Sequence, residues 1–88
     1  MPVLVTTRIP GLPAEAYDET ASQLAGALRG TEGFIAHAGS ADVDGVTVTE
    51  LWEKEADWAG FFETYVRPNL PESLPAPTVV EIRQTILR

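Results

Sequence analysis

The sequence predicts an α+β fold with the element order βαββαβ, and three observations support it. Four segments alternate apolar and polar residues in the way that strands do: 3–9, 34–40, 46–52 and 78–87. Two further segments, within 13–28 and 56–66, repeat apolar residues at helical spacing. Asp44-Gly45 lies between the second and third predicted strands, and this pair is typical of a β-hairpin turn.

The first half of the chain predicts a strand, a helix and a second strand. The first strand ends at Pro10-Gly11, and Pro13 suits the first turn of the following helix. The helix carries one apolar stripe: Tyr17, Ala21, Leu24 and Leu28. Gly30 and Gly33 end it, and the hairpin of the second and third strands turns at 42–45.

The second half predicts a broad apolar helix followed by one more strand. The helix stripe has the spacing i, i+3, i+4, i+7 and i+8: Trp58, Phe61, Phe62, Tyr65 and Val66. Arg67-Pro68 ends or bends this helix, because a proline restricts the residue before it. A proline-rich connection, 68–77, leads to the last strand at 78–87.

This element order is that of a ferredoxin-like domain, and residues 1–88 are expected to form one such domain. Both helices then cover one face of a four-stranded antiparallel sheet. The first strand is apolar in both registers, with Val3 and Val5 on one side and Leu4 on the other. An open apolar face favours a partner, so we expect a homodimer of the dimeric α/β barrel type.

Composition excludes several classes of function. Six Lys and Arg against 13 Asp and Glu give a net charge of −7, which would repel a nucleic-acid backbone. No apolar run approaches the length of a membrane span, and no basic leader precedes the first strand, so we expect a cytoplasmic protein. The chain has no cysteine and one histidine, His37, so we expect no metal site.

The predicted hairpin places the single histidine near a carboxylate. Either register of a turn at 42–45 puts His37 on one face with Glu50 and Trp52, directly across from one and diagonal to the other. A carboxylate bonded to one imidazole nitrogen fixes the tautomer and leaves the other nitrogen as a base or a donor. His37 and Glu50 are therefore the candidate catalytic pair, although a cross-strand pair of this kind can also be a purely structural contact.

The aromatic residues nearby are candidate walls of a binding pocket. Trp52, Trp58, Phe62 and Tyr65 would supply apolar surface for a small aromatic ligand, although residues at such spacing can equally belong to the core. Tyr65 stands out because a buried tyrosine needs a partner for its hydroxyl group. Arg67 and Arg83 are each either solvated charges or holders of an acidic substrate.

Five short stretches together resemble the antibiotic biosynthesis monooxygenase (ABM) domain family. They are Gly33-Phe34-Ile35-Ala36-His37, Asp44-Gly45, Glu50-Leu51-Trp52-Glu53, Asp57-Trp58 and Phe61-Phe62. The resemblance covers nearly the whole chain, and it implies the dimeric α/β barrel fold. The superfamily holds cofactor-free oxygenases, polyketide cyclases, heme-degrading enzymes and members without a known activity, so the fold leaves the reaction open.

This sequence differs from the residue patterns of two groups within the superfamily, and the differences limit which activities the resemblance implies. Heme-degrading relatives bind iron through a histidine on the second helix, and this chain has none between Lys54 and Pro71. The Asn-Trp-Arg set of anthrone-oxidising members does not transfer, because the only asparagine, Asn69, lies in the proline-rich connection.

The resemblance and the candidate residues together predict a function. We expect a cofactor-independent monooxygenase that acts on an aromatic or polyketide-like small molecule in secondary metabolism, with His37 as the base that removes a proton before dioxygen reacts. The alternatives are a polyketide cyclase or isomerase, which could use the same pair, and a non-catalytic dimeric protein that binds a small ligand. No cofactor is expected.

Overall fold

The structure is a computed structural model that describes every residue except residue 72, and its elements follow the predicted order. The strands are β1 (Val3–Pro10), β2 (Phe34–Asp42), β3 (Gly45–Trp52) and β4 (Thr78–Glu81). The helices are α1 (Ala14–Arg29) and α2 (Glu55–Phe61), and α2 continues into the π-helical turn η1 (Phe62–Val66) and the 3-10 turn η2 (Arg67–Asn69). The predicted α+β fold of ferredoxin-like topology is confirmed.

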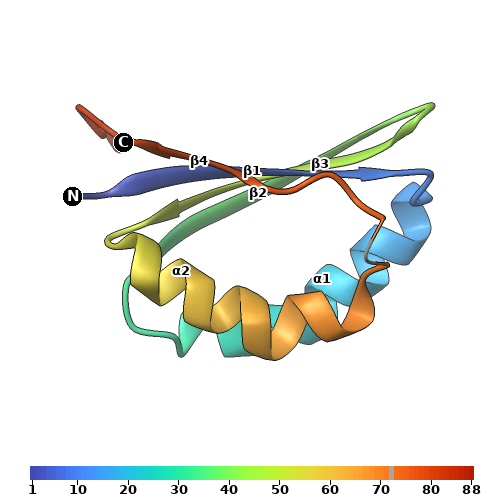
Figure 1. Ribbon diagram of the computed structural model, residues 1–88, viewed down its shortest axis with the longest axis horizontal. Helices are drawn as coiled ribbons and strands as arrows, with labels where there is room; N and C mark the ends of the chain where they lie inside the picture. The colour runs from blue at the N-terminus through green and yellow to red at the C-terminus, as the bar shows by residue number, and fades with distance from the viewer. Residues whose placement is uncertain (72) are drawn as a thin grey trace.

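The four strands form one antiparallel sheet in the order β2-β3-β1-β4. Both helices lie on the same side of it, as Figure 1 shows, so the molecule has a sheet layer and a helix layer. In the hairpin of β2 and β3, His37 pairs with Glu50, which is one of the two predicted registers. The pairing shifts by one residue between Phe34 and Ala36, at a β-bulge.

Three successive rows of side chains cross the helix-covered face of the sheet, and they differ in size and polarity. The pairs of β1 with β3 and of β3 with β2 align these rows as Val3, Trp52 and Phe34; Val5, Glu50 and His37; and Thr7, Val48 and Gly39. The first row is bulky, the second carries the polar pair, and the third is small. This gradient along the strands determines where the helices can pack tightly.

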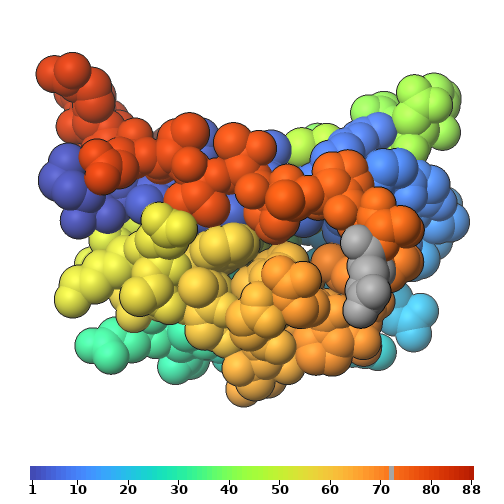
Figure 2. Space-filling view, viewed as in Figure 1, coloured from blue at the N-terminus to red at the C-terminus, as the bar shows by residue number. Residues whose placement is uncertain are grey.

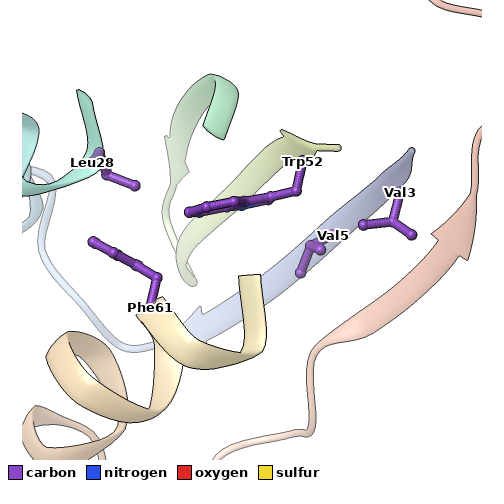
Figure 3. Close-up of a cluster of buried hydrophobic side chains, with 5 residues drawn as sticks. All are labelled: Val3, Val5, Leu28, Trp52 and Phe61. Atoms are coloured by element: carbon purple, nitrogen blue, oxygen red, sulfur yellow. The ribbon is translucent and has the colours of Figure 1, made fainter. Parts of the chain in front are cut away.

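The tightly packed core lies at the bulky row, and we call this region the closed end. It is made of Val3, Val5, Leu28, Trp52 and Phe61, as Figure 3 shows. Trp52 is fully buried, with its ring 5.7 Å from that of Phe61 and edge-on to Phe34 at 5.4 Å. Burying a large apolar side chain contributes about 1.5–3 kcal/mol, so these residues account for much of the fold's stability.

The last strand is shorter than predicted. The prediction of a strand over 78–87 is wrong beyond Glu81, where β4 ends. Its neighbour β1 begins at Val3, which pairs with Glu81, and Ile82 still donates its N–H to the carbonyl of Pro2 at 2.8 Å. Among the described residues, no strand lies beside the chain after Ile82.

The second helix starts as predicted but changes its winding partway. The α-helical hydrogen bonds of α2 give way at Phe62 to the wider π-helical pattern of η1, an arrangement frequent at functional sites. Phe61 and Phe62, adjacent in sequence, are both buried at this transition. Pro68 then lies at the start of η2, where its missing N–H costs no hydrogen bond. No helix in the described part of the chain is long and apolar enough to cross a membrane.

Candidate functional site

A continuous chain of hydrogen bonds joins four side chains from three elements, and we call it the polar chain. The Tyr17 hydroxyl of α1 lies 2.6 Å from Nε2 of His37, and Nδ1 of His37 lies 2.6 Å from Oε2 of Glu50. Nε1 of Trp52 donates to the other carboxylate oxygen of Glu50 at 3.0 Å. The second row of the sheet therefore connects the closed end to the helix α1.

The proton positions in the polar chain follow from its members' chemistry. The indole N–H of Trp52 is only a donor, and an ionised Glu50 is only an acceptor. Glu50 then accepts from Nδ1–H of His37. In the neutral imidazole Nε2 carries no proton, so it accepts from the Tyr17 hydroxyl. Every hydrogen bond is satisfied with a neutral imidazole and a neutral phenol.

The local sequence explains why these groups meet. The hairpin register brings His37 and Glu50 face to face, and both lie on the helix-covered side of the sheet. Gly39, two residues after His37, points to the same side. A Cβ atom at this position would collide with the hydroxyl and ring of Tyr17, so the tyrosine reaches the imidazole only because residue 39 lacks a side chain.

Burial and charge affect two members of the polar chain, Glu50 and Tyr17. Glu50 is 9% exposed, and its two carboxylate oxygens are held by His37 and Trp52. Partial burial raises the pKa of the Tyr17 phenol above its usual value, and the negative charges of Glu50 and Asp18 raise it further. Tyr17 therefore stays protonated at neutral pH and serves as a donor.

The polar chain faces a cavity of about 380 Å³ between the sheet and the helices, within the size range of small-molecule sites. Tyr17, His37 and Glu50 line one wall, and the rest of the lining is mainly apolar, including Ile9, Leu24 and Val48. We call this region, where the sheet presents its small row, the hollow end. It lies where β1 passes into α1, on the right of Figure 1.

The proline-rich connection closes one side of the cavity. Asn69, Leu70, Pro71 and Leu74 contribute to its lining. Figure 2 shows the described part of this segment, in orange, crossing from the helix layer to the sheet. The connection therefore forms part of the cavity wall as well as the route from η2 to β4.

The structure places three of the four predicted wall residues in the cavity. Trp58, Phe62 and Tyr65 line it, with the rings of Trp58 and Phe62 5.2 Å apart. Trp52 does not line it, which corrects the prediction of a wall position. Its ring lies in the closed end, because the bulky row packs against Phe61, and only its N–H reaches the polar chain.

The predicted cationic holders lie elsewhere. Arg67 is bound to Glu63 at 2.8 Å and stacks over the ring of Phe62, and Arg83 is exposed. Among the described residues that line the cavity, Glu50 is the only carboxylate, His37 is the only histidine, and there is no lysine or arginine.

Sequence reasoning missed Tyr17 as a member of the site. The helical spacing correctly assigned it to the inward stripe of α1, yet that pattern does not distinguish a core residue from a hydrogen-bonding one. Gly39 was the available signal, because a glycine next to His37 on the same face leaves room for a large group from the covering helix.

No protein family model and no curated protein matches this chain. Two solved structures resemble it over nearly its whole length. A heme-degrading protein of Mycobacterium tuberculosis, crystallised heme-free as cleaved protein, is 21% identical with a TM-score of 0.62, over 98% of this chain and 99% of its own. A monooxygenase of Streptomyces coelicolor from the gene ActVA-Orf6, crystallised with Nanaomycin D, is 24% identical with a TM-score of 0.63, over 99% of this chain and 91% of its own.

These likenesses show that the chain shares the fold of both proteins. They confirm the fold that the resemblance predicted, and at 21% and 24% identity they show the fold alone. The chemistry of this chain has to be argued from its own cavity and its own polar chain.

Proposed function

We propose that this protein is a cofactor-independent enzyme that removes a proton from a neutral aromatic or polyketide-like small molecule, so that the resulting anion reacts with dioxygen. The observation that supports it best is the placement of His37: a neutral imidazole, oriented by a buried carboxylate, on the wall of an apolar cavity. A base of this kind can accept a proton near neutral pH, and Glu50 stabilises the imidazolium that forms.

The proposed oxygenation balances without a metal or a flavin. The base takes one proton from an activated CH₂ group of the substrate, and the carbanion or phenolate that remains transfers an electron to dioxygen. Recombination, with the proton returned from the imidazolium, gives a hydroperoxide, which loses water to leave a carbonyl group. The CH₂ carbon loses four electrons and dioxygen gains four, with one oxygen atom in the product and one in water.

The cavity indicates the class of substrate. Its walls are largely aromatic and aliphatic, which suits flat, apolar rings. No lysine or arginine lies among the described lining residues, and Glu50 would repel an acidic group. We therefore propose a neutral substrate whose charge develops only when the proton is removed. The Streptomyces coelicolor monooxygenase was crystallised with Nanaomycin D, which agrees with a ligand of polyketide type.

Heme does not fit the residues present. The other similar structure is of a heme-degrading protein, and heme iron needs an axial ligand such as a histidine nitrogen. His37 is the only histidine of the chain, and both its ring nitrogens are hydrogen-bonded to protein side chains. Binding iron would require breaking one of these bonds, so no step of the proposed reaction involves heme.

A cyclase or isomerase is the second candidate, and one observation favours it. Such reactions need a base to remove a proton and an acid to return one at another atom. Tyr17 and His37 place a hydroxyl donor and an imidazole 2.6 Å apart on the same wall. The same proton abstraction would then end in ring closure or double-bond migration instead of oxygen uptake.

Turnover with candidate substrates tests the proposal. Anthrones and other phenolic polyketides would be supplied in metal-free, flavin-free buffer, with oxygen consumption and product formation followed together. We expect one dioxygen consumed per product, and a rate about 10² to 10⁴ lower for His37→Ala. Product without oxygen uptake would favour the cyclase or isomerase. Full activity in folded His37→Ala would remove this residue from the mechanism, and ligand binding without any turnover would favour a non-catalytic binding protein.

Glu50→Gln provides a sharper variant, because the amide would reverse the polar chain. Its oxygen must accept from Trp52, so its NH₂ group would donate to Nδ1 of His37 and force the proton onto Nε2. The imidazole would then have no free base nitrogen toward Tyr17. We expect a loss comparable with that of His37→Ala, and wild-type activity would contradict the proposed tautomer.

We also propose that the protein works in the cytoplasm as a homodimer formed through the helix-free face of the sheet. An apolar row crosses this face, with Val80 and Leu51 on either side of Leu4, and Val80 is 48% exposed. Light scattering should give about twice the subunit mass of 9.5 kDa. Leu51→Lys should give monomers, because it would bury a charge in the interface. A wild-type mass near 9.5 kDa would contradict the dimer.

A further inference from the structure

Neither ring nitrogen of His37 is available to a ligand in this structure. Nδ1 is held by Glu50 and Nε2 by the Tyr17 hydroxyl, each at 2.6 Å. A substrate in the cavity that approaches the base from the α1 side therefore meets the phenol oxygen of Tyr17 before it meets the imidazole. This oxygen uses its hydrogen toward His37 and keeps a lone pair for a second partner.

From this geometry we infer that Tyr17 is the catalytic residue that exchanges the proton with the substrate, and that His37 acts through it as a relay. The inference rests on the function proposed above and adds the group that touches the substrate. Tyr17 and His37 both line the cavity, and their ring planes are only 5° apart. The phenol is held in one orientation by this contact and by the space above Gly39.

The relay moves one proton with no net change in Tyr17. The substrate's bond to hydrogen breaks as the phenol oxygen takes that proton, and the phenol releases its own proton to Nε2 of His37. The products are a substrate anion and an imidazolium ion beside Glu50. Tyr17 need not exist as a free phenolate, which agrees with a pKa that burial and the charges of Glu50 and Asp18 raise.

His37 also borders a second hollow. It is an open groove between α1 and the edge strand β2, which His37 lines together with Ala21, Ser22 and Ala25. We call it the edge groove. His37 therefore lines both hollows, and Tyr17 lines only the cavity. Both ring nitrogens are hydrogen-bonded, so the imidazolium keeps its proton until Tyr17 returns it to the reacting substrate.

The first test uses nitrogen NMR and needs no turnover. The chain has one histidine, so the imidazole signals are assigned without ambiguity, and it has two tyrosines, so one can serve as the control. In protein labelled with ¹⁵N in the imidazole, Tyr17→Phe should shift the Nε2 resonance of His37 strongly, since it removes the hydrogen-bond donor and keeps the ring. Tyr65→Phe removes the other tyrosine hydroxyl of the cavity wall and should leave this resonance unchanged. An Nε2 resonance that is the same in Tyr17→Phe and wild type would overturn the inference.

The second test follows proton transfer to the protein with a coloured probe, a hydroxyanthraquinone whose absorbance reports the ionisation of its phenol. Binding to wild type should shift the absorbance toward the anion. The shift should be lost in His37→Ala, and in Tyr17→Phe it should develop at least tenfold more slowly in a stopped-flow measurement. Equal rates of ionisation in wild type and Tyr17→Phe would overturn the relay and leave the proposed function intact. A probe that binds none of the variants would contradict the proposed function.

Once a substrate is known, kinetics should separate the relay from a structural role. We expect Tyr17→Phe to lower kcat by about 10² with little change in KM, and Tyr17→Phe combined with His37→Ala to be no slower than His37→Ala alone. Gly39→Ala should reproduce the Tyr17→Phe effect by displacing the phenol. Gly26→Ala, on α1 with open space around it, is the matched control and should keep full activity. If the fold-losses in kcat of the two single variants multiply in the double variant, the two residues act independently and the relay is overturned.

Discussion

The closed end and the hollow end lie in the same layer between sheet and helices, yet only one of them is filled. At the closed end the sheet presents Val3, Trp52 and Phe34, and Phe61 of α2 packs against them. At the hollow end it presents Thr7, Val48 and Gly39, beneath helices that are held apart by the bulky row. A cavity therefore forms where small residues follow large ones along the same strands.

The polar chain marks the boundary between the two ends. Trp52 anchors Glu50 from the closed side, and Tyr17 meets His37 on the hollow side. A base that must act in a precise orientation gains from this placement, because the rigid core holds it while the cavity admits the ligand. Because the closed end is filled and the hollow end is not, we expect the same kind of substitution to have unequal effects at the two ends.

The two tryptophans should give the largest difference in stability. Trp52→Ala should lower the free energy of unfolding by about 3–5 kcal/mol, because it opens a new cavity in a fully packed region and leaves one carboxylate oxygen of Glu50 without its donor. Trp58→Ala should lower it by only about 1–2 kcal/mol, because Trp58 is half-buried and its loss enlarges an existing cavity. Urea unfolding followed by circular dichroism measures both. Equal losses would contradict the distinction between the ends.

Adding a methylene group should give a smaller difference of the same kind. Val5→Leu at the closed end should cost about 1–3 kcal/mol through overpacking, because Val5 is 1% exposed among fixed neighbours. Val48 lines the cavity, so the extra methylene of Val48→Leu has room there. This substitution should lower the free energy of unfolding by less than about 1 kcal/mol. Thermal unfolding of the two variants beside wild type provides the measurement. A greater loss for Val48→Leu would mean that the hollow end is already filled.

Alkaline pH should affect the hollow end through Tyr17. Its raised pKa means that the folded state favours the neutral phenol, so this contribution is complete below the usual tyrosine pKa of about 10 and is lost as pH rises through the folded value. Tyr17→Phe removes the titrating group, so its stability should fall less steeply than that of wild type above about pH 10.

The matched variant for this pH dependence is Tyr65→Phe, which removes a cavity tyrosine outside the polar chain. Unfolding midpoints in urea, measured at several pH values for the three proteins, provide the comparison. Tyr65→Phe should keep the part of the alkaline loss that comes from Tyr17. If the stability of Tyr17→Phe falls with alkaline pH as steeply as that of wild type, the folded state does not raise the pKa of the Tyr17 phenol.

The sequence was sufficient to predict the fold and the first half of the polar chain. Strand alternation and the hairpin turn determine that His37 and Glu50 share a face, because pairing in a hairpin is fixed by its turn. Tyr17 was out of reach of this reasoning, since helical spacing specifies an inward direction but not the strand residue that the side chain meets.

Two other predictions failed for reasons that lie outside local sequence pattern. The alternation in 78–87 continues beyond Glu81, but a strand needs a partner, and β1 begins at Val3, which pairs with Glu81. Trp52 and Trp58 have the same chemistry, and only the packing of the helices against the bulky row decides that the first is core and the second is cavity wall.

The most direct test of the central claim, that the hollow end is the ligand site, is a titration of ¹⁵N-labelled protein with a hydroxyanthraquinone, followed by backbone amide NMR. We expect the largest shifts at Thr7, Gly39 and Tyr65, with Val3 and Trp52 nearly unchanged. Shifts concentrated on the helix-free face around Leu51, or none at saturating probe, would contradict the account.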